Sequence, residues 1–387
     1  SPLAMRRSSS RCASAIFASS CRMASTPSPL TADMTIEDVS ADWLTGVLRG
    51  SGFDGAQITD LQVEVIGEGV GIMGLLYRVK LSYSESSAKE VPQSVVIKVP
   101  SPHEQTRHIA RAFMFYGKEI GFYRDAAKDT PLDTPRCYAA HHDPESDDFV
   151  LVLEDLDGME VVSQLDGCPI DKAEIAIEAL ARHHAAFWES ERFSEDLAWL
   201  PFGWDVPFPQ AIAQGFSQAW PTCMEMFPNG VSERIKKVGE KFPTVTSEMM
   251  ELADSPVTLA HGDFRLDNLF FQNEDLKVID WQICIKTVGG YDVGYFLSQS
   301  LTIEDRRNHE RDLLDKYRKT LSEIGLDYPQ DRLMEDYRRS VLFCLAYPVQ
   351  ASAAALVNER AVQLVTEMFA RVSTAIEDLN ADEFLPE

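Results

Sequence analysis

Three side chains with oxygen ligands lie in one short stretch of the chain. Asn268 follows Asp263 by five positions, and Asp280 follows it by seventeen. An apolar run on either side of the polar turn 272–275 predicts a β-hairpin, which would bring these three side chains together. Two carboxylates and an amide supply the hard oxygen ligands that Mg²⁺ prefers, with one carboxylate left to orient a hydroxyl group. The pattern therefore indicates phosphoryl transfer.

A glycine-rich turn upstream has the spacing of a phosphate-binding loop. Gly69, Gly71 and Gly74 form a G-x-G-x-x-G motif, and glycine lets backbone N–H groups approach a phosphate without a Cβ atom in the way. The same motif marks dinucleotide sites when a helix follows it. Here the segment 77–81 alternates apolar and cationic residues, which predicts a strand. Strand, turn and strand favour a kinase-type loop, whereas the motif alone would indicate an ordinary hairpin.

A lysine and a glutamate follow in the order of a kinase ion pair. Lys98 lies near the end of the β-prone run 94–99. Glu119 lies in the segment 113–124, whose apolar residues share one helical face in spite of two glycines. In kinases such a lysine reaches the α- and β-phosphates, and a glutamate from the next helix holds it. The alternative for Lys98 is a position on a solvated face of the strand, and the alternative for Glu119 is an ordinary surface ion pair.

The order of these motifs resembles the aminoglycoside phosphotransferase and choline kinase superfamily, which shares the protein-kinase-like bilobal fold. The string His-Gly-Asp-x-x-x-x-Asn (261–268) resembles its catalytic loop, and Ile-Asp-Trp-Gln (279–282) resembles its metal-binding segment. The resemblance covers roughly residues 35–375 and implies an α+β fold with a small β-rich N-lobe and a large, mainly helical C-lobe. Four strings are similar to the ecdysteroid-kinase-like, or CHK-kinase-like, branch: 119–123, 153–156, 280–282 and 291–297.

The resemblance implies a role for each of these residues. The glycine loop and Lys98 hold the triphosphate of ATP, and Glu119 orients the lysine. Asn268 and Asp280 hold Mg²⁺, while Asp263 orients or deprotonates the acceptor, a hydroxyl group of a small molecule. Further implied residues are Glu154, Asp155 and Leu156 at the adenine, and His261, Arg265 and Asp292 as supports of the catalytic loop, with Arg265 either near phosphate or substrate or paired with Asp267.

The chain departs from protein kinases at three motifs. It has His-Gly-Asp in place of His-Arg-Asp, Asp-Trp-Gln in place of Asp-Phe-Gly, and no Ala-Pro-Glu. We therefore expect neither a protein substrate nor activation-loop control. Two rival classes stay open: a nucleotide-binding pseudokinase with a regulatory or scaffold role, and a Rossmann oxidoreductase, which requires a helix after Gly74.

The chain divides into three parts by composition and motif order. Residues 1–33 hold four arginines and one acid, and we expect them to be disordered. They are either a transit peptide for an organelle such as the mitochondrion, or residues upstream of the true start, which would leave the protein cytoplasmic. Residues 34–156 are expected to form the nucleotide-binding N-lobe, which ends at the hinge. Residues 157–387 are expected to form the helical C-lobe with the catalytic loop and the acceptor site.

Composition argues against several partners. Residues 34–387 carry 32 basic and 60 acidic residues, and so acidic a surface would repel nucleic acid. No stretch approaches the roughly 20 apolar residues of a membrane helix. The seven cysteines are dispersed without a metal-ligand pattern, which suits a reducing compartment and no disulfide framework. We expect a monomer or homodimer whose partner is a small-molecule alcohol.

Three local features extend these expectations. Thr35, with an acid three residues on, is expected to begin the first helix. The segment 171–190 has helical periodicity, and we expect one of His183 and His184 to be packed and the other solvated. The aromatic segment 199–208 either lines the acceptor pocket or covers the core of the C-lobe.

Overall fold

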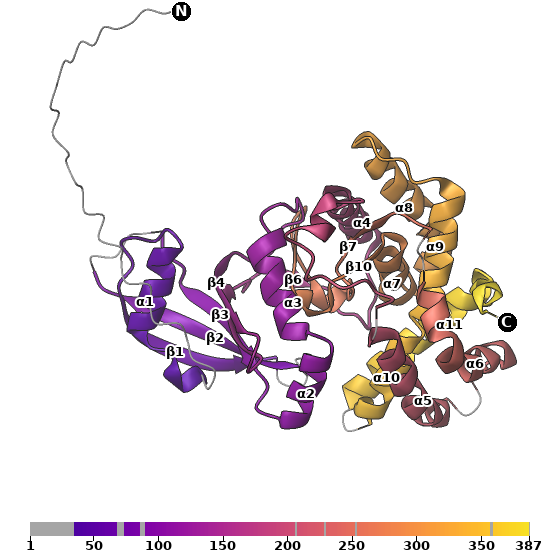
Figure 1. The fold of residues 1–387 in the computed structure, drawn as a ribbon, viewed down its shortest axis with the longest axis horizontal. Coiled ribbons are helices and arrows are strands. Elements are labelled where there is room, and N and C mark those ends of the chain that lie inside the picture. Colours follow the sequence, from indigo (N-terminus) through magenta and orange to yellow (C-terminus); the bar gives the residue numbers. More distant parts are fainter. Residues whose placement is uncertain are drawn as a thin grey trace, which may run out of the picture.

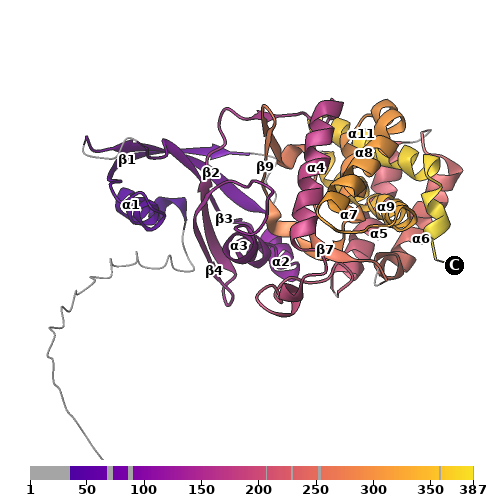
Figure 2. The ribbon, with the colours of Figure 1, turned by 90° about the horizontal axis from the view of Figure 1, so that it is seen from above.

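The computed structural model describes residues 35–67, 73–85, 90–205, 207–227, 230–251, 254–356 and 359–386. Gly69 and Gly71 lie outside these residues. The described chain forms two lobes, a β-sheet with its helices at one end and a cluster of helices at the other (Figure 1). The view from above shows β9 (Asp275–Val278) between the sheet and the helical lobe (Figure 2).

The N-lobe is built on one antiparallel sheet with the strand order β1-β2-β3-β5-β4. β3 has neighbours on both sides, and its Val95, Ile97 and Val99 are almost wholly buried. Because side chains alternate along a strand, Lys98 points to the opposite face, toward the other lobe. The element after Gly74 is a strand, as predicted, which removes the basis of the Rossmann alternative. The strands are β1 (Ile58–Ile66), β2 (Gly74–Tyr83), β3 (Ser94–Pro100), β4 (Cys137–Asp143) and β5 (Asp148–Glu154).

The helices of the N-lobe are α1 (Ala41–Gly50), α2 (Glu104–Ala112) and α3 (Phe115–Gly121), and α3 continues as one π-helical turn (Phe122–Ala126). The expectation that Thr35 begins the first helix is wrong. Thr35 and Asp38 close only a short 3₁₀ turn (Ile36–Asp38). α1 begins at Ala41 because the Ser40 hydroxyl accepts a hydrogen bond from Trp43 N at 3.1 Å and caps the helix there.

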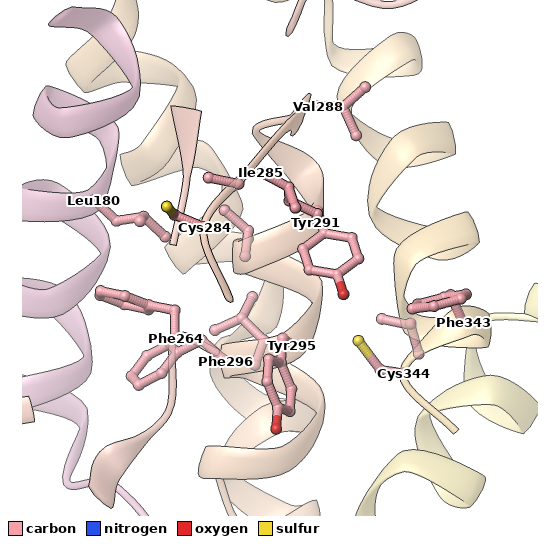
Figure 3. Close-up of a cluster of buried hydrophobic side chains, with 14 of the residues drawn as sticks. Leu180, Phe264, Cys284, Ile285, Val288, Tyr291, Tyr295, Phe296, Phe343 and Cys344 are labelled. Atoms are coloured by element: carbon pink, nitrogen blue, oxygen red, sulfur yellow. The ribbon is translucent and has the colours of Figure 1, made fainter. Parts of the chain in front are cut away.

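The C-lobe is mainly helical and surrounds α7 (Gly290–Ser300), in which every residue is buried. Glycine lets α9 lie directly against α7, since a Cβ atom on Gly294 would be 2.8 Å from Ser340 Cβ. Figure 3 shows Tyr291 and Tyr295 of α7 opposite Phe343 in the aromatic core. None of the described helices combines the length and apolarity needed to cross a membrane. The other helices are α4 (Ile170–Ala186), α5 (Phe208–Met226), α6 (Glu233–Met250), α8 (Ile303–Glu323), α9 (Gln330–Phe343), α10 (Ala346–Ala355) and α11 (Glu359–Asp378).

Two small antiparallel sheets position the functional segments of the C-lobe. One pairs β7 (Val257–Ala260) with β10 (Ile285–Val288), and the other contains β6 (Glu160–Val161), β8 (Leu269–Gln272) and β9 in that order. β8 and β9 are the predicted hairpin. Leu269 pairs with Val278, so the chain segments that carry Asn268 and Asp280 leave the hairpin side by side.

Packing bears on two expectations about the C-lobe. His183 and His184 are both wholly buried, so the expectation of one solvated histidine is wrong. Each ring has polar partners inside the lobe that make its burial possible, among them Leu259 O for His183 at 2.9 Å. The described part of the aromatic segment 199–208 packs on the C-lobe core, where the rings of Phe202 and Trp204 stack at 4.8 Å, and it does not line the cleft between the lobes.

Candidate active site

A cleft of about 410 Å³ lies between the two lobes. The N-lobe lines it with β1, β2, β3, α3 and the hinge after β5, and the C-lobe lines it with the catalytic loop and the segment after β9. Gly74 lies in the wall, where a Cβ atom would be 2.9 Å from Val99 O, so a side chain would push the two strands apart. The apolar part of the lining suits a flat aromatic base and includes Leu76, Val96, Leu153, Leu156, Phe270 and Ile279.

Lys98 lies in this cleft between two carboxylates. Its Nζ atom is 2.7 Å from Glu119 Oε2 and 2.8 Å from Asp280 Oδ1, and its side chain is 10% exposed. Burial alone would lower the pKa of Lys98, but the charges of Asp280 and Glu119 raise it above the ordinary lysine value. Burial raises the pKa of Glu119 to about 7 in spite of the lysine. When both carboxylates are ionised, the cluster of Lys98, Glu119 and Asp280 carries one net negative charge.

Asp263, the predicted catalytic residue, is held by its neighbours. The Asn268 side-chain amide donates to Asp263 O at 2.9 Å and to Asp263 Oδ2 at 3.0 Å, and Arg265 Nε donates to Oδ1 at 3.1 Å. Arg265 also pairs with Asp267, one of its two expected positions, and it lines the cleft. The hydroxyl of Tyr295 also bonds to Asp263, and burial together with the Asp263 charge raises the pKa of this phenol. The Asp263 carboxylate is therefore fixed from three directions.

Asp292, near the start of α7, holds the backbone of the catalytic loop. Its carboxylate accepts hydrogen bonds from His261 N at 2.7 Å and Gly262 N at 2.9 Å. His184 Nε2 lies 3.1 Å from the same carboxylate, and His184 Nδ1 lies 2.7 Å from Tyr317 OH. Burial alone would raise the pKa of Asp292, but these hydrogen bonds and the neighbouring histidines lower it below the ordinary value. This is the geometry of a structural support.

His261 links the predicted catalytic loop (261–268) to the predicted metal-binding segment (279–282). Its Nδ1 atom accepts a hydrogen bond from Asp263 N at 3.1 Å. A neutral imidazole that accepts at one nitrogen carries its proton on the other, so Nε2 donates to Ile279 O at 2.9 Å. Both ring nitrogens are thus engaged by backbone, and His261 ties two chain segments together.

Three further supports lie outside the predicted set. His184 and Tyr317 extend the Asp292 network, and Gln164 Oε1 accepts a hydrogen bond from Leu266 N of the catalytic loop at 3.0 Å. The helical periodicity around His184 signalled burial but no partner. The sequence did not indicate Tyr317 or Gln164 as a support, because their contacts join residues 133 and 102 positions apart.

Asp280 lies on a constrained turn at the end of the hairpin. Its backbone has φ +66°, a left-handed conformation that is uncommon for a residue with a Cβ atom. The next residue, Trp281, is fully buried and stacks on Phe122 with the ring centroids 3.7 Å apart. Ile279 N donates to Asn268 O at 3.1 Å, so Asp280 directly follows a residue that is bonded to Asn268. The structure therefore brings the predicted metal-binding residues together.

The donor set here fits Mg²⁺. Asp280 supplies carboxylate oxygens, and because the amide nitrogen of Asn268 faces Asp263, that contact leaves its carbonyl oxygen to a cation. In the described part of the chain, no group of three or more His, Cys, Asp or Glu could hold a metal by itself. Mg²⁺ at a nucleotide usually takes only one or two protein carboxylates and completes its shell with phosphate oxygens and water.

The hinge residues have carboxylates that are already paired. Glu154 Oε2 lies 2.6 Å from Lys277 Nζ, and Asp155 Oδ2 lies 2.8 Å from Arg78 Nε. Both residues and Leu156 line the cleft. These ion pairs fix the hinge, so a base bound there would use the backbone of these residues and not their carboxylates. Their role at the adenine stays a prediction.

Solved structures with the same fold include several small kinases. A choline kinase from Cryptosporidium parvum matches with a TM-score of 0.54 and 12% identity over 90% of this chain and 98% of that chain. Amicoumacin kinase, in complex with AMP-PNP, Ca²⁺ and Ami, matches with 0.52 and 12% over 86% and 92%. The GDP complex of aminoglycoside 2′-phosphotransferase-IIIa matches with 0.50 and 16% over 89% and 100%. These likenesses confirm the predicted protein-kinase-like bilobal α+β fold.

The family is shown by the sequence. The ecdysteroid kinase-like family matches residues 68–327, more than half of the 387-residue chain, and the chain belongs to this family. The predicted superfamily and branch are thereby confirmed. No curated protein matches the chain. Family and fold together indicate a small-molecule phosphotransferase of the kinase-like type.

Proposed function

We propose that the protein transfers the γ-phosphoryl group of ATP, with Mg²⁺, to a hydroxyl group of a small molecule. One observation carries this proposal: Lys98 and Glu119 of the N-lobe meet Asp280 of the C-lobe in one cleft. A buried lysine there suits the phosphates, and the oxygens of Asp280 and Asn268 suit the metal. The family and the fold support the reaction class, and a neighbour of the same fold was solved with AMP-PNP.

Each residue has its own task in this mechanism. Lys98 holds the phosphates that are not transferred, and Glu119 keeps the lysine directed into the cleft. Mg²⁺, when held by Asn268 and Asp280, neutralises charge on the phosphates. Asp263 accepts a hydrogen bond from the acceptor hydroxyl. It takes the proton as the new oxygen–phosphorus bond forms and the bond between ADP and the γ-phosphorus breaks.

Positioning accounts for most of the rate in a reaction of this kind, because its transition state is loose and needs little covalent help. The catalytic loop provides such positioning before any ligand binds. Asn268 and Arg265 hold the Asp263 carboxylate, while Asp292 holds the backbone at residues 261 and 262. Arg265 also pairs with both Asp263 and Asp267, so its charge offsets part of theirs. Only about a fifth of the Arg265 side chain is exposed.

The test is ATP turnover with a panel of small alcohols, with products identified by mass spectrometry. We expect Asp263→Asn to lower turnover roughly a hundred- to ten-thousandfold, because the proton acceptor is lost while the side chain keeps its size. The control is Asp315→Asn, at an exposed position of α8, which should leave turnover unchanged. Equal turnover by Asp263→Asn and the wild type would contradict the proposal, and ATP-analogue binding without any turnover by the wild type would favour the pseudokinase.

A further inference from the structure

Gln282 is a residue of the cleft that the mechanism above does not use. It lies two positions after Asp280, in the 3₁₀ turn Trp281–Ile283, and it lines the cleft together with Lys98 and Glu119. Its Nε2 atom donates a hydrogen bond to Asp280 Oδ2 at 3.2 Å. Lys98 Nζ donates to the other oxygen, Oδ1, at 2.8 Å. The two oxygens of the Asp280 carboxylate are thus held by two different donors.

The contact with Asp280 also fixes the orientation of the Gln282 amide. An ionised carboxylate only accepts hydrogen bonds, so the amide must turn its NH₂ group toward Asp280 and its oxygen away. That oxygen, Oε1, is buried and has no hydrogen-bond partner among the described residues. A buried acceptor without a partner costs on the order of 1–3 kcal/mol of stability. Stability alone therefore does not explain an amide at this position.

The backbone on both sides of Gln282 is held in place, which limits where its side chain can reach. Trp281 is wholly buried, stacks on Phe122, and donates from Nε1 to Val278 O at 3.2 Å. Cys284 N donates to Trp281 O at 3.2 Å and closes the turn. The side chain of Gln282 is therefore presented to Asp280 from a rigid support.

We propose that Gln282 is a positioning residue that sets the affinity of the site for Mg²⁺. This inference rests on the proposed function. A bound triphosphate attracts Lys98, and the withdrawal of the lysine leaves Asp280 Oδ1 to the metal. Gln282 keeps its bond to Oδ2, so the carboxylate does not rotate to follow the lysine and its free oxygen stays in place. Residues that orient a metal ligand in this way typically change metal affinity by about ten- to a hundredfold when they are replaced.

The test compares wild type and Gln282→Met by calorimetric titration with a non-hydrolysable ATP analogue, with and without Mg²⁺. Methionine has a similar length but cannot donate to Asp280. We expect the analogue to bind both proteins equally without Mg²⁺, and the tightening that Mg²⁺ produces to fall about tenfold or more in the variant. Without ligand, the melting temperature should stay equal or rise, because an unpaired buried acceptor is removed.

Further variants separate this role from a structural one. Gln350 on α10 is also partly buried and does not line the cleft, so Gln350→Met should change neither binding nor melting. Gln282→Asn shortens the side chain and withdraws the amide from Oδ2, so it should reproduce the loss of the Mg²⁺ effect even if the Gln282→Met protein does not fold. A lower melting temperature with equally weakened binding in both conditions would mean a structural role and overturn the inference.

Failure of this inference is distinguishable from failure of the proposed function. If the wild type binds the analogue and Gln282→Met keeps the full Mg²⁺ effect, only the role of Gln282 is overturned. If the wild type binds no analogue in either condition, the proposed function is overturned with it.

Discussion

At the scale of single residues, Lys98 is both the phosphate-binding group of the proposal and a structural cation. It neutralises Glu119 from α3 and Asp280 from the segment after β9, and both partners are mostly shielded from water. Removing one member of a buried charge cluster leaves the others uncompensated, which costs more than the pair contributes by itself. The loss of Lys98 should therefore weaken the fold as well as nucleotide binding.

We expect Lys98→Met to lower the free energy of unfolding by about 3–5 kcal/mol, measured by urea denaturation without ligand. Adding Glu119→Gln to this variant should recover part of the loss, because one uncompensated carboxylate disappears. The control is Lys80→Met, at an exposed position of β2, which should change the free energy little. Equal stability of Lys98→Met and the wild type would show that Lys98 is solvated, which is the alternative stated for this lysine in the sequence analysis.

The charged residues of this site were predictable because their types are unusual for their surroundings. A lysine in a β-prone run and acids next to an apolar hairpin are visible in the sequence alone. Their supports were not predictable in the same way. Gln282 was noticed only as part of a string, and its unpaired oxygen is a property of three-dimensional packing.

At the scale of elements, α3 shows what local propensity misses. Two glycines weakened the prediction of a helix, yet the helix forms because each glycine allows a close contact. A Cβ atom on Gly117 would lie 3.2 Å from the His142 ring, and one on Gly121 would lie 2.9 Å from the Trp199 ring. The packing that explains these glycines joins α3 to other elements and cannot be read from the helix sequence.

α3 also buries a lysine next to Glu119. Lys118 is 3% exposed, and its Nζ atom lies 5.3 Å from the centroid of the Phe115 ring. Burial lowers the pKa of Lys118 to about 8, against a smaller opposite effect of Cys284. Since the unfolded chain holds this proton up to a higher pH, burial of the charged form opposes folding at neutral pH.

We expect Lys118→Met to raise the free energy of unfolding at pH 7 by on the order of 1–3 kcal/mol. Between pH about 8 and the ordinary lysine pKa, the unfolded chain binds the proton and the folded chain does not, so the wild type gains stability as pH rises. The advantage of Lys118→Met should shrink over that window. Urea denaturation at several pH values measures this difference in the free energy of unfolding. The control is Lys319→Met, at a side chain that is 78% exposed, which should leave the free energy of unfolding unchanged. A variant advantage that is absent, or constant across pH, would contradict the buried cation.

At the scale of the whole molecule, the cleft exists only because two lobes meet. Lys277 of β9 pairs with Glu154 at the hinge, and the rings of Phe113 and Phe208 make a second contact between the lobes with centroids 5.8 Å apart. Motif order was enough to predict the bilobal fold, since the motifs follow one another along this chain as they do in the superfamily that it resembles. The acceptor site stays a prediction, because no motif of the sequence specifies the acceptor, and the described part of the aromatic segment 199–208 packs on the hydrophobic core without lining the cleft.

The central claim is that Asp280 and Asn268 hold a metal across a nucleotide bound to Lys98. The most direct measurement is titration of wild type and Asp280→Asn with a non-hydrolysable ATP analogue, with and without Mg²⁺. Asp275→Asn, at an exposed position of the same hairpin, is the control. We predict that Mg²⁺ tightens binding to the wild type and the control by about tenfold or more and has no effect on Asp280→Asn. An undiminished Mg²⁺ effect in Asp280→Asn would contradict the claim.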